Sequence, residues 1–354
     1  MMNKTQKTYK PDKPFKKVED QIETLKKRGL EITDVNSAKE AILTYNYYNI
    51  INGYKQPFIE DSSNGVDKYK KGTNFNDLLD LYKFDRSLRK NIFTITLDIE
   101  CTFYTHVAYA IGEKYGHKPQ NYLHILNYKQ GKKQTNKKTQ RTNLLERLNK
   151  YIKYSEIEPL KYYRENYKNM PPWILVKGLT FGQVYTLYEL SKSDVKDSII
   201  RGILGVKTID EPLREFFAKM MSVIIKYRNW SAHGGRIYNH RCKPHVAYWE
   251  SLCDSFEITR KEFNKGQGKN DLLALTMCIC FFYQERPESF IEYFVLLNQA
   301  CQTFKNSNIV TYSQVIRETG LPIEVHSIFL EMLKKREFAT AFTKEYKELS
   351  EVPD

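Results

Sequence analysis

The sequence has no C-x-x-C pair and no long hydrophobic run, and these absences exclude several classes of protein. Its six cysteines indicate neither a zinc ribbon nor a disulfide framework, so a reducing cytoplasm fits. The basic N-terminal stretch lacks the apolar segment of a signal peptide, and the run "LLALTMCICFFY" is shorter than the roughly 20 residues that cross a membrane. We therefore expect a cytoplasmic protein without a membrane partner.

Signatures of the common phosphate-binding and hydrolytic enzymes are also missing. The sequence contains no GxxxxGK[ST] loop, no GxSxG elbow and no cluster of acidic metal ligands. It also has no internal repeat of fixed period. A P-loop enzyme, an α/β-hydrolase and a repeat protein are therefore not indicated.

What the sequence has in excess is positive charge and aromatic side chains. Its 56 lysines and arginines outnumber its 42 acidic residues, which gives a formal charge of +14. Such a surplus predicts a polyanionic partner, most often a nucleic acid. The 26 tyrosines and 19 phenylalanines either stack on unpaired bases or only reflect an AT-biased coding sequence.

Hydrophobic periodicity predicts an all-α fold. Apolar residues recur near a 3.6-residue period over most segments, including a helix of about forty residues that follows Thr73/Asn74 and ends at Gly116. We also expect a helix at about 37–53, a loop at 59–74, a helix that begins after Thr208 or Asp210, and further helices up to residue 338. A domain boundary is predicted near 240–245, and we expect a helical domain at 14–240 and a helical region at 241–354.

The segment "YKQGKKQTNKKTQR" has no apolar period and is dense in lysine. It is predicted to be an exposed or disordered basic loop that contacts phosphates. Its candidate RNA-binding residues are Lys132, Lys133, Lys137, Lys138 and Arg141.

The stretch "KYRNWSAHGGRIYNHR" at 226–241 places Arg228, Asn229 and His233 at the end of an apolar helix. In an ideal helix Asn229 and His233 lie about 40° apart around the axis, whereas Arg228 lies about 140° from His233. The two glycines that follow either cap the helix or let a backbone or phosphate approach. Cations near a helix C-terminus are also favoured by the helix dipole alone.

These three residue types suit RNA cleavage by the 2′-hydroxyl group. A histidine transfers protons near neutral pH, an arginine stabilises the charge that develops on the phosphorane, and an asparagine orients the ring or the phosphate. One histidine cannot readily be base and acid in the same step. We therefore expect a second copy of the site from another subunit across a two-fold axis.

Other constellations carry weaker signals. His240, Cys242 and His245 could ligate a metal, but no fourth ligand at zinc-like spacing is visible, so no metal or other cofactor is predicted. Asp85 and Arg89 have the i,i+4 spacing of a surface pair. Cys278 and Cys280 lie two apart in an apolar helix, which favours core packing.

The chain resembles the Abi family of bacterial abortive-infection proteins (the AbiD/AbiF-like group), which in turn resemble the HEPN superfamily of all-helical ribonucleases. Four ordered stretches carry the resemblance, and they span roughly residues 14–240. They are "QIETLKKRGLEI…AILTYNYYNIINGYKQPF", "LYKFDRSLR…DIE", "PPWILVKGLTFGQVYTLYELS" and "RNWSAHGGRIYN".

The resemblance implies a HEPN-like helical bundle with an N-terminal helical element and a helical C-terminal extension. It maps the R-N-x-x-x-H ribonuclease motif of the family onto Arg228, Asn229 and His233. Such enzymes need no metal, usually act as dimers and leave a 2′,3′-cyclic phosphate and a 5′-hydroxyl. The resemblance also implies a structured non-coding RNA as partner.

Within this pattern "FDRSLR" lies on a helix that could pack beside the motif helix. Arg86 and Glu100 are supporting polar groups from that helix, in a structural, interfacial or RNA-contacting role. Arg236 and Asn239 are expected to support the site from the segment after the motif.

Three functions remain open at this stage. The chain is a HEPN-type endoribonuclease in anti-phage defence, a non-catalytic protein that holds a structured or antitoxin RNA, or a protein-binding module with incidental charge.

Overall fold

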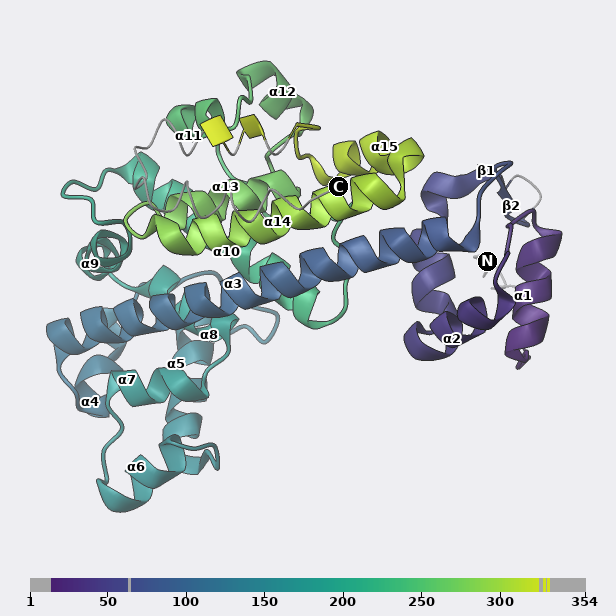
Figure 1. The fold of residues 1–354 in the computed structure, drawn as a ribbon. Helices are drawn as coiled ribbons and strands as arrows, with labels where there is room; N and C mark the ends of the chain where they lie inside the picture. The colour runs from purple at the N-terminus through teal and green to yellow at the C-terminus, as the bar shows by residue number, and fades with distance from the viewer. Residues whose placement is uncertain (1–13, 63–64, 325–326, 329, 332–354) are drawn as a thin grey trace, which may run out of the picture. The chain divides into compact units, whose positions relative to one another are not determined.

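The computed structural model describes residues 14–62, 65–324, 327–328 and 330–331, and only the backbone of residues 309 and 310. Within these ranges helices are joined by loops, and the single sheet has two short strands (Figure 1). The all-α prediction is confirmed. The chain divides into two compact units, of which unit 1 runs up to Phe84 and includes Phe304–Thr311, and unit 2 is the rest.

Unit 1 is built from short elements around the beginning of one long helix. The elements are α1 (Val18–Lys27), α2 (Val35–Tyr45), a π-helix (Tyr48–Asn52), a 3-10 helix (Gln56–Phe58), β1 (Ile59–Asp61), β2 (Lys68–Tyr69) and the first turns of α3 (Phe75–Tyr115). Helices α1 and α2 pack together. They bury Ile22 and Leu25, three residues apart on α1, and Ala38 and Ile42, four residues apart on α2.

Two predictions in unit 1 are wrong. The expected helix at 37–53 is broken at Asn46, which has a positive φ of 71° and whose side chain accepts the N–H of Tyr48 at 2.8 Å. Asparagine tolerates this left-handed conformation better than other non-glycine residues, so it can end α2. The expected loop at 59–74 contains the antiparallel pair β1–β2, which the short polar segment did not reveal.

The long helix α3 is confirmed with the predicted ends. Asn74 and Asp77 cap its first turn reciprocally, because each side chain accepts the backbone N–H of the other residue at 3.1 and 2.8 Å. Gly116 follows the last turn with a φ of 81°. The β-branched run "IFTITLDI" at 92–99 is helical within α3. From Asp85 onward α3 belongs to unit 2.

Unit 2 contains the remaining helices. They are α4 (Pro119–Tyr122), a 3-10 turn (Ile125–Asn127), α5 (Gln140–Tyr154), α6 (Leu160–Asn166), α7 (Pro172–Leu175), a 3-10 turn (Val176–Gly178), α8 (Phe181–Leu190), α9 (Ser193–Leu204), α10 (Glu211–Ala232), α11 (Glu250–Ser255), α12 (Arg260–Lys265), α13 (Leu272–Phe282), α14 (Pro287–Ser307) and α15 (Ile309–Thr319). The last turn of α14 and the start of α15 fall in unit 1.

The core of unit 2 forms where α10 packs against α13, with α8 and α9 beside α10. Every residue of α13 is buried, which is the expected position for a helix that is apolar on all faces. Cys278 and Cys280 are both buried there, so the predicted core packing is confirmed, and burial raises the pKa of the Cys278 thiol. Helix α13 lies beyond residue 240 and packs on α10, so residues from both sides of the predicted domain boundary form this core. The boundary itself stays a prediction.

No helix within the described ranges combines the length and the apolar character needed to cross a bilayer. The amphipathic helix expected at 323–338 lies largely outside the described residues.

Candidate active site

Helix α10 brings the predicted motif to one end of the core. Of the two predicted caps, Asp210 is the one used, since its side chain accepts the N–H of Leu213 at 2.9 Å. Pro212 occupies the first helical turn. The middle of α10 is anchored by buried Phe217 and Met220, so its last turn is held by packing on the core. Arg228 and Asn229 lie in the last two turns, and His233 is the C-terminal cap.

The two glycines after His233 have separate structural roles. Gly234 has a φ of 72° and donates its N–H to the carbonyl of Ser231, and Gly235 donates to the carbonyl of Trp230 at 2.8 Å. This pair of bonds is a Schellman motif, which ends the helix. A Cβ atom on Gly235 would lie 2.4 Å from the indole of Trp230. Of the two predicted roles, capping is the one that these contacts demonstrate.

The chain beyond the glycines folds back onto α10. The indole of Trp230 donates to the carbonyl of Arg236 at 2.8 Å and stacks on His240, with ring centroids 4.6 Å apart and planes 15° apart. Burial, with Arg241 nearby, lowers the pKa of His240, so this imidazole favours its neutral form. Trp230 therefore fixes the path of the chain immediately after the motif.

A buried carboxylate on α3 holds the same segment from the other side. One oxygen of Asp85 accepts the N–H groups of Ile237 and Tyr238 at 2.8 and 2.7 Å, and its second oxygen pairs with Arg89. Asp85 is fully buried, so the predicted surface pair with Arg89 is wrong. Within "FDRSLR", Asp85 thus contacts the segment that follows the motif helix.

Arg228 is held by an acidic side chain on the same helix, α3. Its Nε lies 2.9 Å from Oε2 of Glu100, and both side chains are largely buried. The other carboxylate oxygen, Oε1, accepts the hydroxyl of Tyr104 at 2.8 Å. Burial and the adjacent carboxylate raise the pKa of Tyr104, which keeps it protonated as a donor. The supporting role predicted for Glu100 thus takes the form of orienting Arg228.

The guanidinium group of Arg228 retains N–H donors for a ligand. Its Nε is bound to Glu100, and Nη1 lies 3.4 Å from Oδ1 of Asn229, which is a long hydrogen bond. The guanidinium carbon lies 5.8 Å from the ring centroid of Phe93, which supports the group from one side. The remaining Nη N–H bonds have the planar geometry that binds phosphate oxygens in pairs.

His233 is the most accessible member of the predicted triad. Its side chain is exposed, and its backbone N–H donates to the carbonyl of Asn229 at 3.2 Å. This bond continues the helical register as far as His233, so the two residues remain on one face of α10. The end of α10 therefore presents an exposed imidazole and a partly buried amide and guanidinium.

The other predicted supporting residues lie near this segment but differ in their contacts. Arg86 is exposed on α3, one residue after Asp85. Arg236 is half-buried, with its guanidinium carbon 5.8 Å from the ring centroid of Tyr238, and Asn239 is also half-buried.

The predicted basic loop is ordered by backbone hydrogen bonds. Residues 130–141 form a hairpin-like turn in which Gln140 and Lys132 exchange two bonds, one through the glutamine side chain. Lys138 pairs with both carboxylate oxygens of Glu146 at 2.7 Å, and Arg141 donates to the carbonyl of Tyr128 at 3.0 Å. The loop is exposed, as predicted.

Three of the five candidate RNA-binding residues in this loop have no ion pair among the described residues. They are Lys132, Lys133 and Lys137. Lys138 and Arg141 already bind protein groups, so fewer of their N–H donors remain for another ligand.

The residues considered as metal ligands do not converge. In the part of the chain that the structure describes, no three His, Cys, Asp or Glu side chains form a group that could hold a metal ion. Cys242 is buried with its sulfur 3.0 Å from the carbonyl of Pro244, and His240 stacks on Trp230.

The family of the chain is shown by its match to a known protein family. The model of the Abi-like protein family matches residues 40–239, which is more than half of the chain and includes the whole motif. The chain belongs to the Abi-like protein family. Membership of this Abi-like group indicates a role in abortive-infection defence. No curated protein and no solved structure matches the chain.

Two residues of the Abi-like site were not predicted from the sequence. Tyr104 follows Glu100 by four residues on α3, and this spacing could have suggested a hydrogen-bonded pair. Trp230 lies inside the motif, and the glycine at 235 could have suggested that a bulky ring packs there. The carbonyl of Arg236, which accepts the indole N–H of Trp230, became evident only in the folded chain.

Proposed function

We propose that this Abi-like protein is a metal-independent endoribonuclease of the HEPN type that acts in abortive infection. The observation that carries the proposal is the arrangement at the end of α10. An exposed His233 and the amide of Asn229 share one helix face, and Arg228 beside them is oriented by Glu100. RNA cleavage requires proton transfer and stabilisation of the negative charge on the phosphate, and these side chains have the chemistry for both.

The cleavage step conserves atoms and protons without a cofactor. The 2′-oxygen attacks the adjacent phosphorus, the bond from phosphorus to the 5′-oxygen breaks, and a 2′,3′-cyclic phosphate and a 5′-hydroxyl form. His233 accepts the proton of the 2′-hydroxyl. The free Nη donors of Arg228 bind the non-bridging phosphate oxygens, whose charge increases in the transition state.

The proton for the 5′-oxygen requires a second acid. We propose a homodimer in which the same motif of a second subunit faces the first, so that one imidazole acts as base and the other, protonated, as acid. This arrangement predicts that mixed dimers with one inactive subunit lose cleavage.

The proposed substrate class is RNA, with a structured non-coding RNA as the cognate partner. It is supported by the chain's formal charge of +14 and by Lys132, Lys133 and Lys137 in the hairpin-like loop, which are exposed and have no ion pair within the described ranges. Such side chains bind phosphates and release counterions, so the affinity should fall steeply with salt.

The test is cleavage of a labelled RNA by purified protein with and without EDTA. We expect cleavage to persist in EDTA and to be abolished in His233→Ala, with RNA affinity unchanged. His245→Ala is the matched control, because His245 is also exposed and lies outside the motif. Equal cleavage by the wild-type and His233→Ala proteins would refute the assignment, and loss of cleavage in EDTA would indicate metal-bound water as the nucleophile.

A second function is favoured by the ion pair at Arg228. Because Glu100 neutralises this arginine, the site could hold an RNA without cleaving it. In that case RNA that copurifies with the protein would be a single intact species, and no condition would yield a cyclic phosphate.

A further inference from the structure

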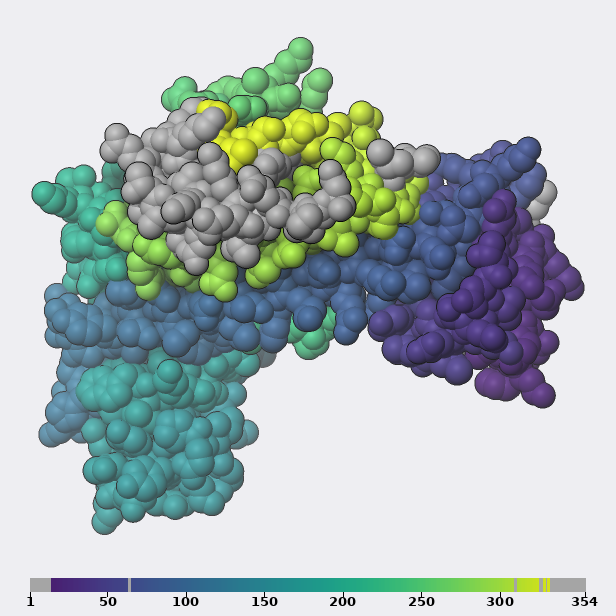
Figure 2. Space-filling view, in the orientation of Figure 1, coloured from purple at the N-terminus to yellow at the C-terminus, as the bar shows by residue number. Residues whose placement is uncertain are grey.

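A region of unit 2 outside the motif carries most of the chain's excess positive charge. We call residues 118–173 the α5–α6 lobe, which includes α4, α5 and α6 (Figure 1). It contains thirteen lysines and arginines against four glutamates and no aspartate, so it holds +9 of the chain's +14. Figure 2 shows this lobe in teal, projecting from the neighbouring α3.

The acidic side chains of the lobe are largely taken up by ion pairs. Glu146 binds Lys138, and Glu156 binds Lys161 at 2.9 Å and Arg164 at 3.1 Å. Few carboxylates remain to neutralise the other cations. Among the described residues, Lys150 and Lys153 on α5 are exposed and lie within 4.0 Å of no carboxylate, so they are available to bind anions.

The same lobe exposes aromatic rings beside these cations. Tyr154 is 70% exposed, Tyr167 60% and Tyr162 50%. Tyr162 and Tyr167 lie edge to face with ring centroids 5.9 Å apart, so they form one aromatic patch on α6 and the residue after it. Exposed aromatic surface grouped in this way is unfavourable in water and is typical of a binding surface.

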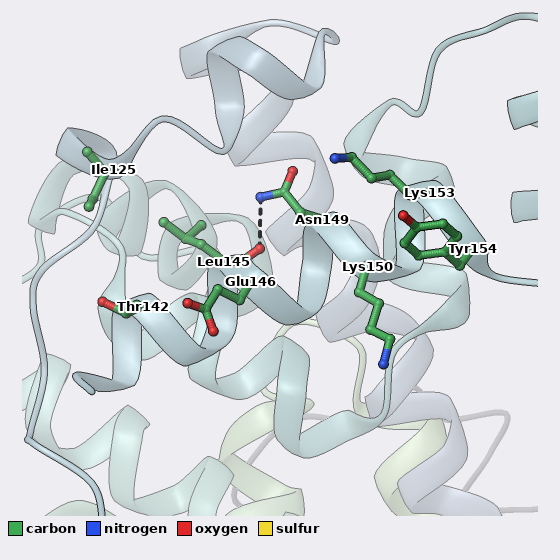
Figure 3. Close-up of a pocket in the computed structure, with 8 residues that line it drawn as sticks. All are labelled: Ile125, Thr142, Leu145, Glu146, Asn149, Lys150, Lys153 and Tyr154. Atoms are coloured by element: carbon green, nitrogen blue, oxygen red, sulfur yellow. Dashed lines mark hydrogen bonds between the residues drawn. The ribbon is translucent and has the colours of Figure 1, made fainter. Parts of the chain in front are cut away.

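A pocket of about 500 Å³ opens between α5 and the turn at Ile125 (Figure 3). Ile125 and Leu145 supply apolar lining, and Lys150, Lys153 and Tyr154 continue along the helix. Asn149 lies between them, with one N–H bound to the carbonyl of Leu145 and its amide oxygen available as an acceptor. The pocket therefore offers an apolar wall, a hydrogen-bonding amide and two cations.

Unpaired RNA fits this combination better than a protein or a membrane surface. Single-stranded nucleic acid needs flat rings for its bases and cations for its phosphates. The lobe carries both, with Lys150, Lys153 and Tyr154 exposed on α5 and Tyr162 and Tyr167 exposed at α6. The exposed rings are tyrosines, and lysines flank them. A duplex would bury its bases and leave the rings without a stacking partner.

The lobe also lies within reach of the motif. Helix α5 packs against α8, and α8 packs against α10, so two helix-to-helix spacings separate α5 from the motif helix. These amount to about 20 Å between the axes of α5 and α10. The contact of α8 with α10 includes Ala218, whose carbonyl accepts the Tyr185 hydroxyl, and Arg228 lies about 15 Å further along the α10 axis. A strand held on the lobe could extend to the end of α10.

We propose that the α5–α6 lobe binds unpaired nucleotides of RNA, with bases stacked on Tyr154, Tyr162 and Tyr167 and phosphates on Lys150 and Lys153. This inference rests on the proposed function for its substrate class, but not on cleavage. According to this proposal, the RNA that the protein binds has a single-stranded segment that contacts the lobe.

The test measures RNA affinity in a full-length His233→Ala background, in which cleavage plays no part. The probes are a labelled twelve-nucleotide oligouridine and a duplex of equal length. Stacking at its weaker end contributes about fivefold per base, so the change of Tyr154, Tyr162 and Tyr167 to alanine should weaken oligouridine binding about hundredfold. Duplex binding should change less than about twofold.

Matched variants separate stacking, charge and folding. The three tyrosine-to-phenylalanine changes keep the rings and should keep the affinity. Lys150→Gln with Lys153→Gln should lower the slope of log affinity against log salt by about 1.4. Tyr48→Ala, which removes a ring 68% exposed in unit 1, should change nothing.

Several results would overturn the proposal. These are failure of the wild-type protein to bind oligouridine, unchanged affinity in the triple alanine variant, or an equal loss for duplex and oligouridine. Phosphatidylserine vesicles serve as a further probe. If the triple alanine variant loses vesicle binding but keeps its RNA affinity, the lobe is a membrane-binding surface instead. If His233→Ala still cleaves RNA, the proposed function fails. The proposal for the lobe is tested separately, because it depends only on the measured RNA affinities.

Discussion

The buried Asp85–Arg89 pair provides the sharpest test of how the site is held. In Asp85→Ala the N–H groups of Ile237 and Tyr238 lose their acceptor, and Arg89, whose side chain is only 13% exposed, loses its carboxylate. Removing one partner of a buried ion pair costs about 3–5 kcal/mol. Since typical domains are stable by only about 5–15 kcal/mol, this change should be easily measured.

The assay is urea denaturation followed by tryptophan fluorescence. The chain has three tryptophans, so Trp173→Phe with Trp249→Phe leaves Trp230, which stacks on His240 beside the affected segment, as the only reporter. We expect Asp85→Ala to lower the free energy of unfolding by about 3–5 kcal/mol and to alter the emission of Trp230 before global unfolding.

Asp85→Asn is the matched control, because the amide keeps one oxygen for the two N–H groups and replaces the oxygen that pairs with Arg89 by an NH2 group. It should cost less than Asp85→Ala. A loss below about 1 kcal/mol in Asp85→Ala, with unchanged Trp230 emission, would refute the argument that this carboxylate holds the segment after the motif.

The remaining predictions concern the contacts of α10. Gly235→Ala should destabilise the protein by about 1–3 kcal/mol in urea melts, because its Cβ atom would meet the Trp230 indole, and an unchanged midpoint would contradict this packing. Glu100→Gln should lower kcat for RNA cleavage about tenfold without raising KM, because Arg228 loses its orientation but not its charge. A rise in KM alone would argue against a positioning role for Glu100. Because the pKa of His240 is lowered in the folded state, the unfolded chain binds more protons below pH 6.5, so stability should fall as the pH falls from 7 towards 5. His240→Phe keeps the ring and should reduce that dependence, and an unchanged pH profile in this variant would contradict it.

Local signals predicted much of the fold. The Asn74 cap of α3 and the Asp210 cap of α10 occur where the sequence indicated, because each depends on side chains within a few residues. The break at Asn46 was missed because the residue's positive φ competes with a helical pattern on both sides. The pairing of β1 with β2 was missed because each strand is too short for an alternating pattern.

The sequence by itself determined the helical class, the family resemblance and the position of the Arg228, Asn229 and His233 motif at the end of one helix. These follow from periodicity, caps and short-range spacing. Tertiary structure decided what surrounds the motif. Glu100 meets Arg228, and Asp85 meets Ile237 and Tyr238, across more than a hundred residues of sequence. Such partners depend on how α3 packs beside the end of α10, and no local pattern encodes that packing.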